Sequence, residues 1–318
     1  MASNWGTSIK SGPHLPNTIW AVGGGKGGIG KSFISSSLAI CLTRLGKSVT
    51  LVDLDLGSAN LHTCLGVKIP EQTLSDFVSG RVSEISQVTV DTEIQGLSFI
   101  SGFNDKLDIA DLTRAGRDRL INSLRQLPSP YVILDLGAGT SENTLDFFNA
   151  ADQKIVAVTP EPTSIENAYR FMKSSFYRKL RQAESELGIQ ELIATAMDPR
   201  NENGIRSPAD LIRHLNRSNP EIGGHLLSKI SGYQVQILLN QVRTRQDIDL
   251  GVSMKSVCSK YFGIQANYLG YVDHDNAVWQ SLRKRRPLIV EFPYSSIVGQ
   301  FLGITKNLLN PHSLRAVI

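Results

Sequence analysis

The sequence lacks paired cysteines, long apolar runs and a strong charge of one sign. Its three cysteines, Cys41, Cys64 and Cys258, are isolated from one another, so neither a zinc site nor a disulfide framework is indicated. No stretch approaches the roughly 18 apolar residues needed to cross a bilayer. The net charge of +4 over 318 residues does not by itself argue for nucleic acid. We therefore expect a cytoplasmic protein.

One glycine-rich stretch, with the letters GKGGIGKS, organises the rest of the chain. It fits the phosphate-binding pattern G-x-x-x-x-G-K-[ST] at every fixed position, and it lies between an apolar strand at 18–22 and a helical pattern at 33–45. Its glycines let backbone N–H groups turn toward an anion, and the helix start adds a positive dipole end. Lys31 is predicted to contact nucleotide phosphates, and the Ser32 hydroxyl to ligate Mg²⁺. The predicted phosphate-binding residues are Gly25, Lys26, Gly27, Gly28, Ile29, Gly30, Lys31 and Ser32.

Three aspartates end two further apolar runs. Asp53 and Asp55 come at the end of the run 49–53, and Asp135 ends the run 130–136, as in a Walker B strand. The carboxyl ends of strands in open α/β sheets are where ligands bind. Near a γ-phosphate, such carboxylates can hold a Mg²⁺-bound water or position the attacking water. The alternative is a pair of solvated strand-end turns.

Strand and helix patterns alternate along the whole chain. This predicts an α/β fold of the Rossmann-like P-loop type, with a mostly parallel, twisted sheet and helices on both faces. We expect residues 1–17 to be a flexible lead-in without signal-peptide character and residues 18–318 to form the P-loop domain. A polar, helical segment at about 173–231 is too long for an ordinary crossover and is predicted to be an insertion. It is either a partner surface or an added packing layer.

Several polar positions have weaker predictions. Asn240 ends a strand at 233–240, where its carboxamide can pair with adenine. The arginines of the helix at 112–127, among them Arg117, are assigned to a solvated face. His274 is assigned to a surface turn. The basic run at 283–286 closes a helix, whose dipole stabilises it, and contact with an anionic membrane or DNA is the alternative.

The motifs together resemble a known family. Lys26-Gly27-Gly28-Ile29-Gly30-Lys31-Ser32, the pair Asp53 and Asp55, the strand ending at Asp135, and Thr159-Pro160-Glu161-Pro162 are similar to the deviant Walker A ATPases of the MinD/ParA class. Within that class the chain is most similar to the MinD/FlhG (FleN) branch. The lysine ahead of two glycines is the specific mark. One difference is Asp273, which stands where the family often has proline.

The resemblance implies an ATP-dependent homodimer that hydrolyses ATP slowly. Lys26 would reach the partner's nucleotide, Asp55 would orient the hydrolytic water, and Asn240 would meet adenine. Asp53 and Asp135 would support Mg²⁺ through waters. Such a switch would regulate the position or number of a cellular structure, of the flagellum, division or polarity type, through an activating or effector protein. The resemblance also allows peripheral contact of the protein with the inner membrane.

Other function classes stay open or are disfavoured. The main alternative is a ParA-like partition ATPase that binds DNA when it holds ATP. It is suggested by the basic residues Arg243, Arg245 and 283–286. An iron–sulfur carrier would need paired cysteines, which the sequence lacks. An amidoligase-like or kinase-like P-loop enzyme is a further alternative, which turnover of a small-molecule acceptor would reveal.

Overall fold

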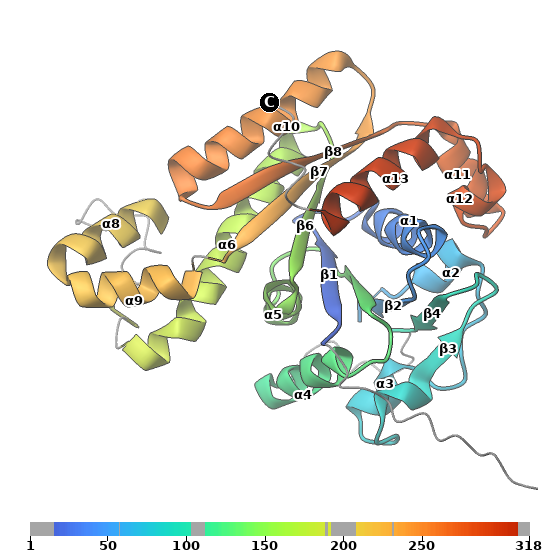
Figure 1. Cartoon of the computed structure of the whole chain (residues 1–318), viewed down its shortest axis with the longest axis horizontal. Coiled ribbons are helices and arrows are strands. Elements are labelled where there is room, and N and C mark those ends of the chain that lie inside the picture. Colours follow the sequence, from blue (N-terminus) through green and yellow to red (C-terminus); the bar gives the residue numbers. More distant parts are fainter. Residues whose placement is uncertain are drawn as a thin grey trace, which may run out of the picture.

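The computed structural model describes residues 16–56, 58–102, 112–187, 190–191, 208–230 and 232–310. One eight-stranded sheet runs through this part of the chain, in the order β3-β4-β2-β5-β1-β6-β7-β8 (Figure 1). Only the edge pair β3–β4 is antiparallel, and the other neighbours are parallel. The strands are β1 (Thr18–Gly23), β2 (Val49–Leu54), β3 (Thr89–Asp91), β4 (Leu97–Ile100), β5 (Tyr131–Leu136), β6 (Gln153–Val158), β7 (Gln234–Val242) and β8 (Gln265–Asp273).

Helices cover both faces of the sheet, which explains why the central strands are continuous apolar runs. One face packs on the group α1 (Lys31–Arg44), α2 (Leu61–Leu65), α12 (Leu288–Glu291) and α13 (Ser296–Leu309). The other face packs on α3 (Leu74–Val78), α4 (Arg114–Arg125), α5 (Glu142–Ala150), α6 (Pro162–Leu187) and α10 (Arg245–Val257). The short helix α11 (Asn276–Arg283) follows β8. Two single-turn helices, η1 (Ile85–Val88) and η3 (Cys258–Phe262), complete the described elements. The predicted α/β fold is confirmed.

The segment expected to be an insertion is helical where the structure describes it. α6 is a continuous helix of 26 residues, so the expected boundary near 173 falls inside it. α8 (Pro208–Ser218) and α9 (Pro220–Ile230) pack on each other and on α6, apart from the sheet (Figure 1). The leucines at 211, 215 and 226 are fully buried and belong to the same apolar cluster as this face of the sheet. Leu227, on α9, is 39% exposed.

The helix α4 corrects one prediction about its arginines. Arg117 is only 5% exposed, so it does not lie on a solvated face. Its guanidinium donates to the Leu112 carbonyl at 2.6 Å and to Asn143 at 3.1 Å. Arg125 is also engaged, since it binds Asp152 through two hydrogen bonds. Apolar periodicity identified the buried stripe of α4 but could not show that charged partners face it.

Several short elements, among them α2 and β3, had no expectation in the sequence. α2 and the edge strand β3 are too short to show a periodic apolar pattern, and β3 is held by pairing with β4 rather than by its own composition. The expected lead-in falls almost entirely on residues 1–15, which lie outside the described residues. None of the helices in the described ranges is both long enough and apolar enough to cross a membrane.

Candidate functional site

The phosphate loop, residues 24–30, joins β1 to α1 at the carboxyl edge of the sheet. Gly28 and Gly30 have φ angles of 77° and 89°, a left-handed backbone that glycine adopts without steric cost. A side chain on Gly25 would collide with the backbone of α6. α1 begins at Lys31 with no side-chain cap and no acidic residue in its first turn. Its first backbone N–H groups are therefore left for an anion.

Asp53 and Asp135 lie side by side because they are paired positions on the neighbouring strands β2 and β5. Each is only 1% exposed. Asp53 accepts hydrogen bonds from the backbone N–H groups of Asp55 and Leu61 at 3.1 and 3.0 Å. Burial, and then the charge of Asp135, raises the pKa of Asp53, and burial likewise raises the pKa of Asp135. The carboxyl groups of Asp53 and Asp135 therefore lose their protons less readily than exposed ones, and a nearby cation would favour their ionised forms.

Two hydroxyl groups of α1 contact Asp135. Ser35 Oγ donates to Asp135 Oδ1 at 2.9 Å, and the Ser32 hydroxyl donates to the same carboxylate. Residues three apart lie on the same side of a helix, so both serines face β5. These hydrogen bonds partly oppose the rise in the pKa of Asp135. Ser35 was not predicted from the sequence, although its i, i+3 spacing from Ser32 was a usable signal.

The side chain of Lys31 lies close to these aspartates. It is 8% exposed, and burial lowers its pKa, while Asp135 and Asp55 act in the opposite direction. We call Lys31, Asp53, Asp55 and Asp135 the acid edge. One ammonium group faces three carboxyl groups there, so a divalent cation can neutralise the surplus negative charge.

The acid edge fits Mg²⁺ rather than a protein-caged metal. Among the described residues, no group of three or more His, Cys, Asp or Glu side chains is arranged to hold a metal ion. Mg²⁺ keeps several waters and usually takes few protein ligands together with phosphate oxygens. The Ser32 hydroxyl and the carboxylates of Asp53 and Asp135 supply oxygen ligands of the kind this ion uses, directly or through water.

Asp55 faces the loop that follows β5. A side-chain carbon placed on Gly137 would come within 3.1 Å of Asp55 Oδ1. In the same loop, the Gly139 N–H donates to the Gly24 carbonyl at 3.3 Å. The loop at 137–140 therefore contacts both a carboxylate of the acid edge and the phosphate loop, and Ser141 then caps α5.

Lys26 points to a different place from Lys31. Its Nζ donates to Glu161 Oε2 at 2.9 Å and to Thr163 Oγ1 at 3.3 Å, both at the start of α6. The Lys26 side chain is 39% exposed, and that of Glu161 is 57% exposed. The structure thus brings Lys31 together with the aspartates and leaves Lys26 on the rim of the loop.

Asn240 lies against the phosphate loop. It is 3% exposed, and its Nδ2 donates to the Ile29 carbonyl at 2.8 Å. A side chain on Gly30 would collide with the same amide nitrogen. Asn240 therefore braces the loop, and it also lines a pocket of about 340 Å³ together with Gly28 and Trp279. The pocket places the carboxamide beside a space next to the phosphate-binding groups.

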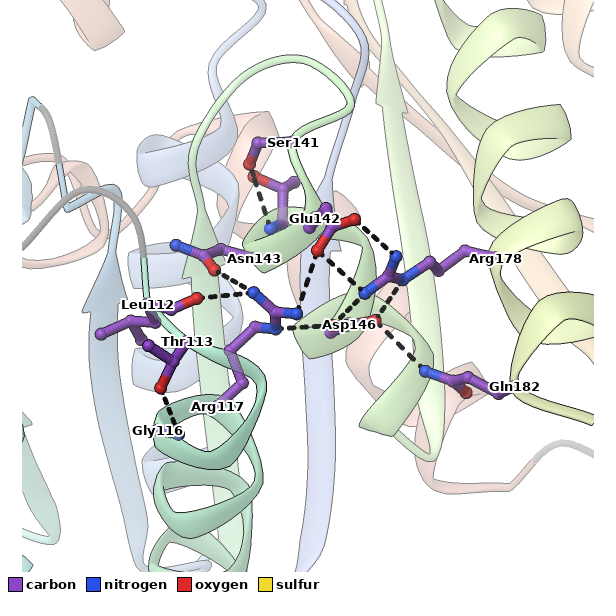
Figure 2. Close-up of polar contacts among 11 residues, drawn as sticks. Leu112, Thr113, Gly116, Arg117, Ser141, Glu142, Asn143, Asp146, Arg178 and Gln182 are labelled. Carbon is purple, nitrogen blue, oxygen red and sulfur yellow. Dashed lines mark hydrogen bonds and ion pairs between the residues drawn. The ribbon is translucent and has the colours of Figure 1, made fainter. Parts of the chain in front are cut away.

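A second cluster of charge ties α5 to α4 and α6 (Figure 2). We call Arg117, Glu142, Asp146 and Arg178 the arginine network. Arg117 forms ion pairs with Asp146 at 2.7 Å and Glu142 at 3.1 Å. Arg178 binds Asp146 with two hydrogen bonds of 2.8 and 2.9 Å and Glu142 at 2.9 Å. Hydrogen bonding to Arg178 lowers the pKa of Glu142. The network anchors the helix that begins directly after the loop at 137–140.

Comparison with known proteins agrees with this geometry. The profile of the CobQ/CobB/MinD/ParA nucleotide binding domain matches residues 20–288. The chain belongs to this family. The match includes the phosphate loop, the acid edge and Asn240, and it extends through α11.

Relatives within the family include the antiactivator FleN of Pseudomonas aeruginosa, which is 25% identical over 304 residues and aligns with 94% of this chain and 89% of its own. The flagellum site-determining protein YlxH of Helicobacter pylori is 34% identical over 156 residues, covering 48% of this chain and 52% of its own. A solved structure of MinD from Pyrococcus horikoshii, complexed with Mg-ADP, has a TM-score of 0.64 at 18% identity. It covers 95% of this chain and 100% of its own, which supports the MinD-like fold.

Proposed function

We propose that the chain binds ATP with Mg²⁺, hydrolyses it slowly, and forms a face-to-face homodimer on ATP. The observation that carries this proposal is the contrast between two lysines of one loop. Lys31 is buried at the acid edge, whereas Lys26 is exposed at the rim, where it binds Glu161 and Thr163. A rim lysine is placed to approach the nucleotide of a second copy. A cation supplied by that copy would make hydrolysis conditional on dimerisation.

Each residue of the acid edge has a separate role in this proposal. Lys31 and the N–H groups of the phosphate loop bind the phosphates. Ser32, Asp53 and Asp135 hold Mg²⁺, which when bound neutralises charge on the phosphate oxygens. Asp55 orients the attacking water, because its carboxylate lies beside the loop at 137–140. Asn240 keeps the loop in shape through Ile29 and presents its carboxamide to adenine.

The test is sedimentation velocity of the full chain with ATP, in an Asp55→Ala background that we expect to retain ATP. This form should sediment as a dimer. Adding Lys26→Ala should leave it a monomer, because the cation shared between copies is lost. Lys47→Ala is the matched control, since Lys47 is exposed in the segment that follows α1. A dimer that persists unchanged in the Lys26→Ala form would contradict the proposal.

We further propose that the dimer acts through an effector protein to set the position or number of a cellular structure. Two relatives support this class of function by their names, antiactivator and flagellum site-determining protein. We assign residues 18–318 to the ATPase domain, after a lead-in at 1–17, and the partner surface to the insertion at about 173–231. α8 and α9 stand apart from the sheet, and Leu227 is exposed there.

Co-purification with the ATP-held Asp55→Ala form tests this assignment. An effector should be retained with ATP and lost without it. Leu227→Asp should abolish retention without affecting the dimer, whereas Val252→Asp, which changes a residue 58% exposed on α10, should not. If the Leu227→Asp form retained the effector as well as the Val252→Asp form does, the insertion would be excluded as the partner surface.

ATP-dependent DNA binding of the ParA type is the second candidate. Arg243, Arg245 and the run at 283–286 are exposed. However, Lys284 and Arg286 both pair with Glu291, at 2.7 and 3.0 Å, so part of this charge is matched locally. DNA binding would appear as ATP-dependent retention that falls steeply with salt. Retention of anionic vesicles instead would support the peripheral membrane contact.

A further inference from the structure

The pocket of about 340 Å³ beside the phosphate loop has an aromatic wall. Gly28 and Gly30 of the loop form one part of its lining, and Phe33 and Asn240 form another. The rest of the lining comes from Gln241, from the junction at 273–275 and from α11, which contributes Trp279. A concave, partly aromatic space directly next to phosphate-binding groups suits a flat ring system attached to those phosphates.

Trp279 is exposed to an unusual degree for so large an apolar side chain. It is 59% exposed, whereas Trp20 in β1 is 1% exposed. Leaving an indole in water forgoes the free energy that its burial would supply. Trp279 also lines the pocket, so a ligand ring that enters the pocket would bury part of the indole.

Arg283 holds the indole from one side. Its guanidinium carbon lies 4.7 Å from the centre of the Trp279 ring, a cation–π contact between residues one helical turn apart. This contact limits the rotamers of Trp279 and occupies one face of the ring. The other face is left for stacking, and a ring fixed in advance loses less entropy when a ligand stacks on it.

The strand-to-helix junction that carries Trp279 is fixed by hydrogen bonds. Asp273 and Gln300 of α13 form two reciprocal bonds, of 3.0 and 2.7 Å. The His274 N–H donates to the Val242 carbonyl at 2.8 Å, and Asp275 caps α11. Asp273 stands where the family often has proline, a residue that restricts the backbone. Here the hydrogen bonds between Asp273 and Gln300 fix the junction instead. α11 is therefore held at a set distance from the phosphate loop.

We propose that Trp279 is the stacking platform for the base of the bound nucleotide and that Arg283 positions it. The proposal rests on the nucleotide binding proposed above and adds the residue on which the base stacks. Two fused rings cover more of an indole than the single ring of a pyrimidine does, so stacking should give a modest preference for a purine. The stack is Arg283, indole and base, in that order.

Calorimetric titration of the full-length chain with MgADP, MgCDP and pyrophosphate tests this. Trp279→Ala should weaken ADP binding about tenfold and narrow the preference for ADP over CDP, because stacking is lost. Trp279→Phe should retain most of the affinity. Arg283→Ala should weaken ADP binding about threefold. Pyrophosphate affinity should not change in any variant, because the phosphate loop is intact.

Matched controls separate stacking from general damage. Tyr294→Ala removes an aromatic ring that is 99% exposed and lies outside the pocket, and Arg286→Ala removes one positive charge from the same basic run. Both should bind ADP like the wild-type chain. In fluorescence, ADP but not pyrophosphate should change the tryptophan emission, and Trp279→Phe should abolish that change.

The outcomes distinguish the two proposals. Unchanged ADP affinity in Trp279→Ala, with normal binding by the wild-type chain, overturns the stacking role alone. An equal loss of pyrophosphate affinity also overturns it, because it would show a collapsed site. A wild-type chain that binds no nucleotide overturns both proposals. ADP binding that depends on Trp279, without ATP-driven dimerisation, leaves the stacking role supported and contradicts the dimer.

Discussion

The acid edge and the arginine network are both clusters of charged side chains, yet they are balanced in opposite ways. In the network, two guanidinium groups face the carboxylates of Asp146 and Glu142, and the pKa of Glu142 is lowered. At the acid edge, one ammonium group faces three carboxyl groups, and the pKa of Asp53 is raised. In the network the charges compensate one another within the fold, whereas the surplus negative charge of the acid edge can be compensated by a ligand cation.

Removing the shared acid of the arginine network should have the largest effect. Asp146→Ala leaves the buried Arg117 and the mostly buried Arg178 with one carboxylate of the network, the exposed Glu142. Loss of one member of a buried ion pair costs about 3 to 5 kcal/mol, because the remaining charge is uncompensated. Urea unfolding followed by circular dichroism measures this change. Asp118→Ala, an exposed acid on α4, should change stability by less than about 0.5 kcal/mol. A comparable loss of stability in the Asp146→Ala and Asp118→Ala forms would show that the arginine network does not depend on Asp146.

Removing the cation of the acid edge should affect binding more than folding. Lys31→Ala should weaken ADP binding about 100-fold, or about 2.7 kcal/mol, because a charge-assisted contact with the phosphates is lost. Isothermal titration calorimetry measures the affinity. Lys47→Ala removes an exposed lysine from the segment that follows α1 and should bind normally. Normal affinity in the Lys31→Ala form would show that the phosphates bind elsewhere.

Neutralising one acid of the edge should stabilise the chain without nucleotide, the reverse of the change in the network. The pKa of Asp135 is raised by burial above its unfolded value of about 3.9, so the folded state binds the proton more tightly. That contribution is complete below the unfolded pKa and is lost as pH rises through the folded pKa. Asp135→Asn should therefore gain about 1 to 2 kcal/mol at pH 8 and nothing near pH 4.

Urea unfolding across this pH range, without Mg²⁺ or nucleotide, checks the prediction for Asp135→Asn. Asp118→Asn is the control and should show no gain that depends on pH, because Asp118 is exposed. A loss of stability in Asp135→Asn at pH 8 would mean that the carboxylate is already well compensated in the free chain.

The sequence was sufficient for features that depend on neighbouring residues. The phosphate loop, the apolar strands and the order of strand and helix follow from local patterns, and strands that end in aspartate lead to the same sheet edge. To predict that Asp53 lies beside Asp135, the order of the strands must also be known, because it places β2 next to β5.

Contacts between distant segments were not predictable in this way. Arg117 was assigned to solvent because its partners, Glu142, Asn143 and Asp146, come from a different helix. The bond between Asn240 and Ile29 joins strand β7 to the phosphate loop, and no local pattern marks it. Such contacts depend on how helices and strands pack, which composition and periodicity do not encode.

The position of β1 has a consequence for the order in which the chain is made. β1 is synthesised first among the strands, but it lies between β5 and β6, and its loop is braced by Asn240 of β7. A nascent chain that ends before β6 lacks one neighbour of β1, and one that ends before β7 has an unbraced loop. The nucleotide site is thus completed late in translation, and nucleotide binding selects chains whose sheet is already assembled.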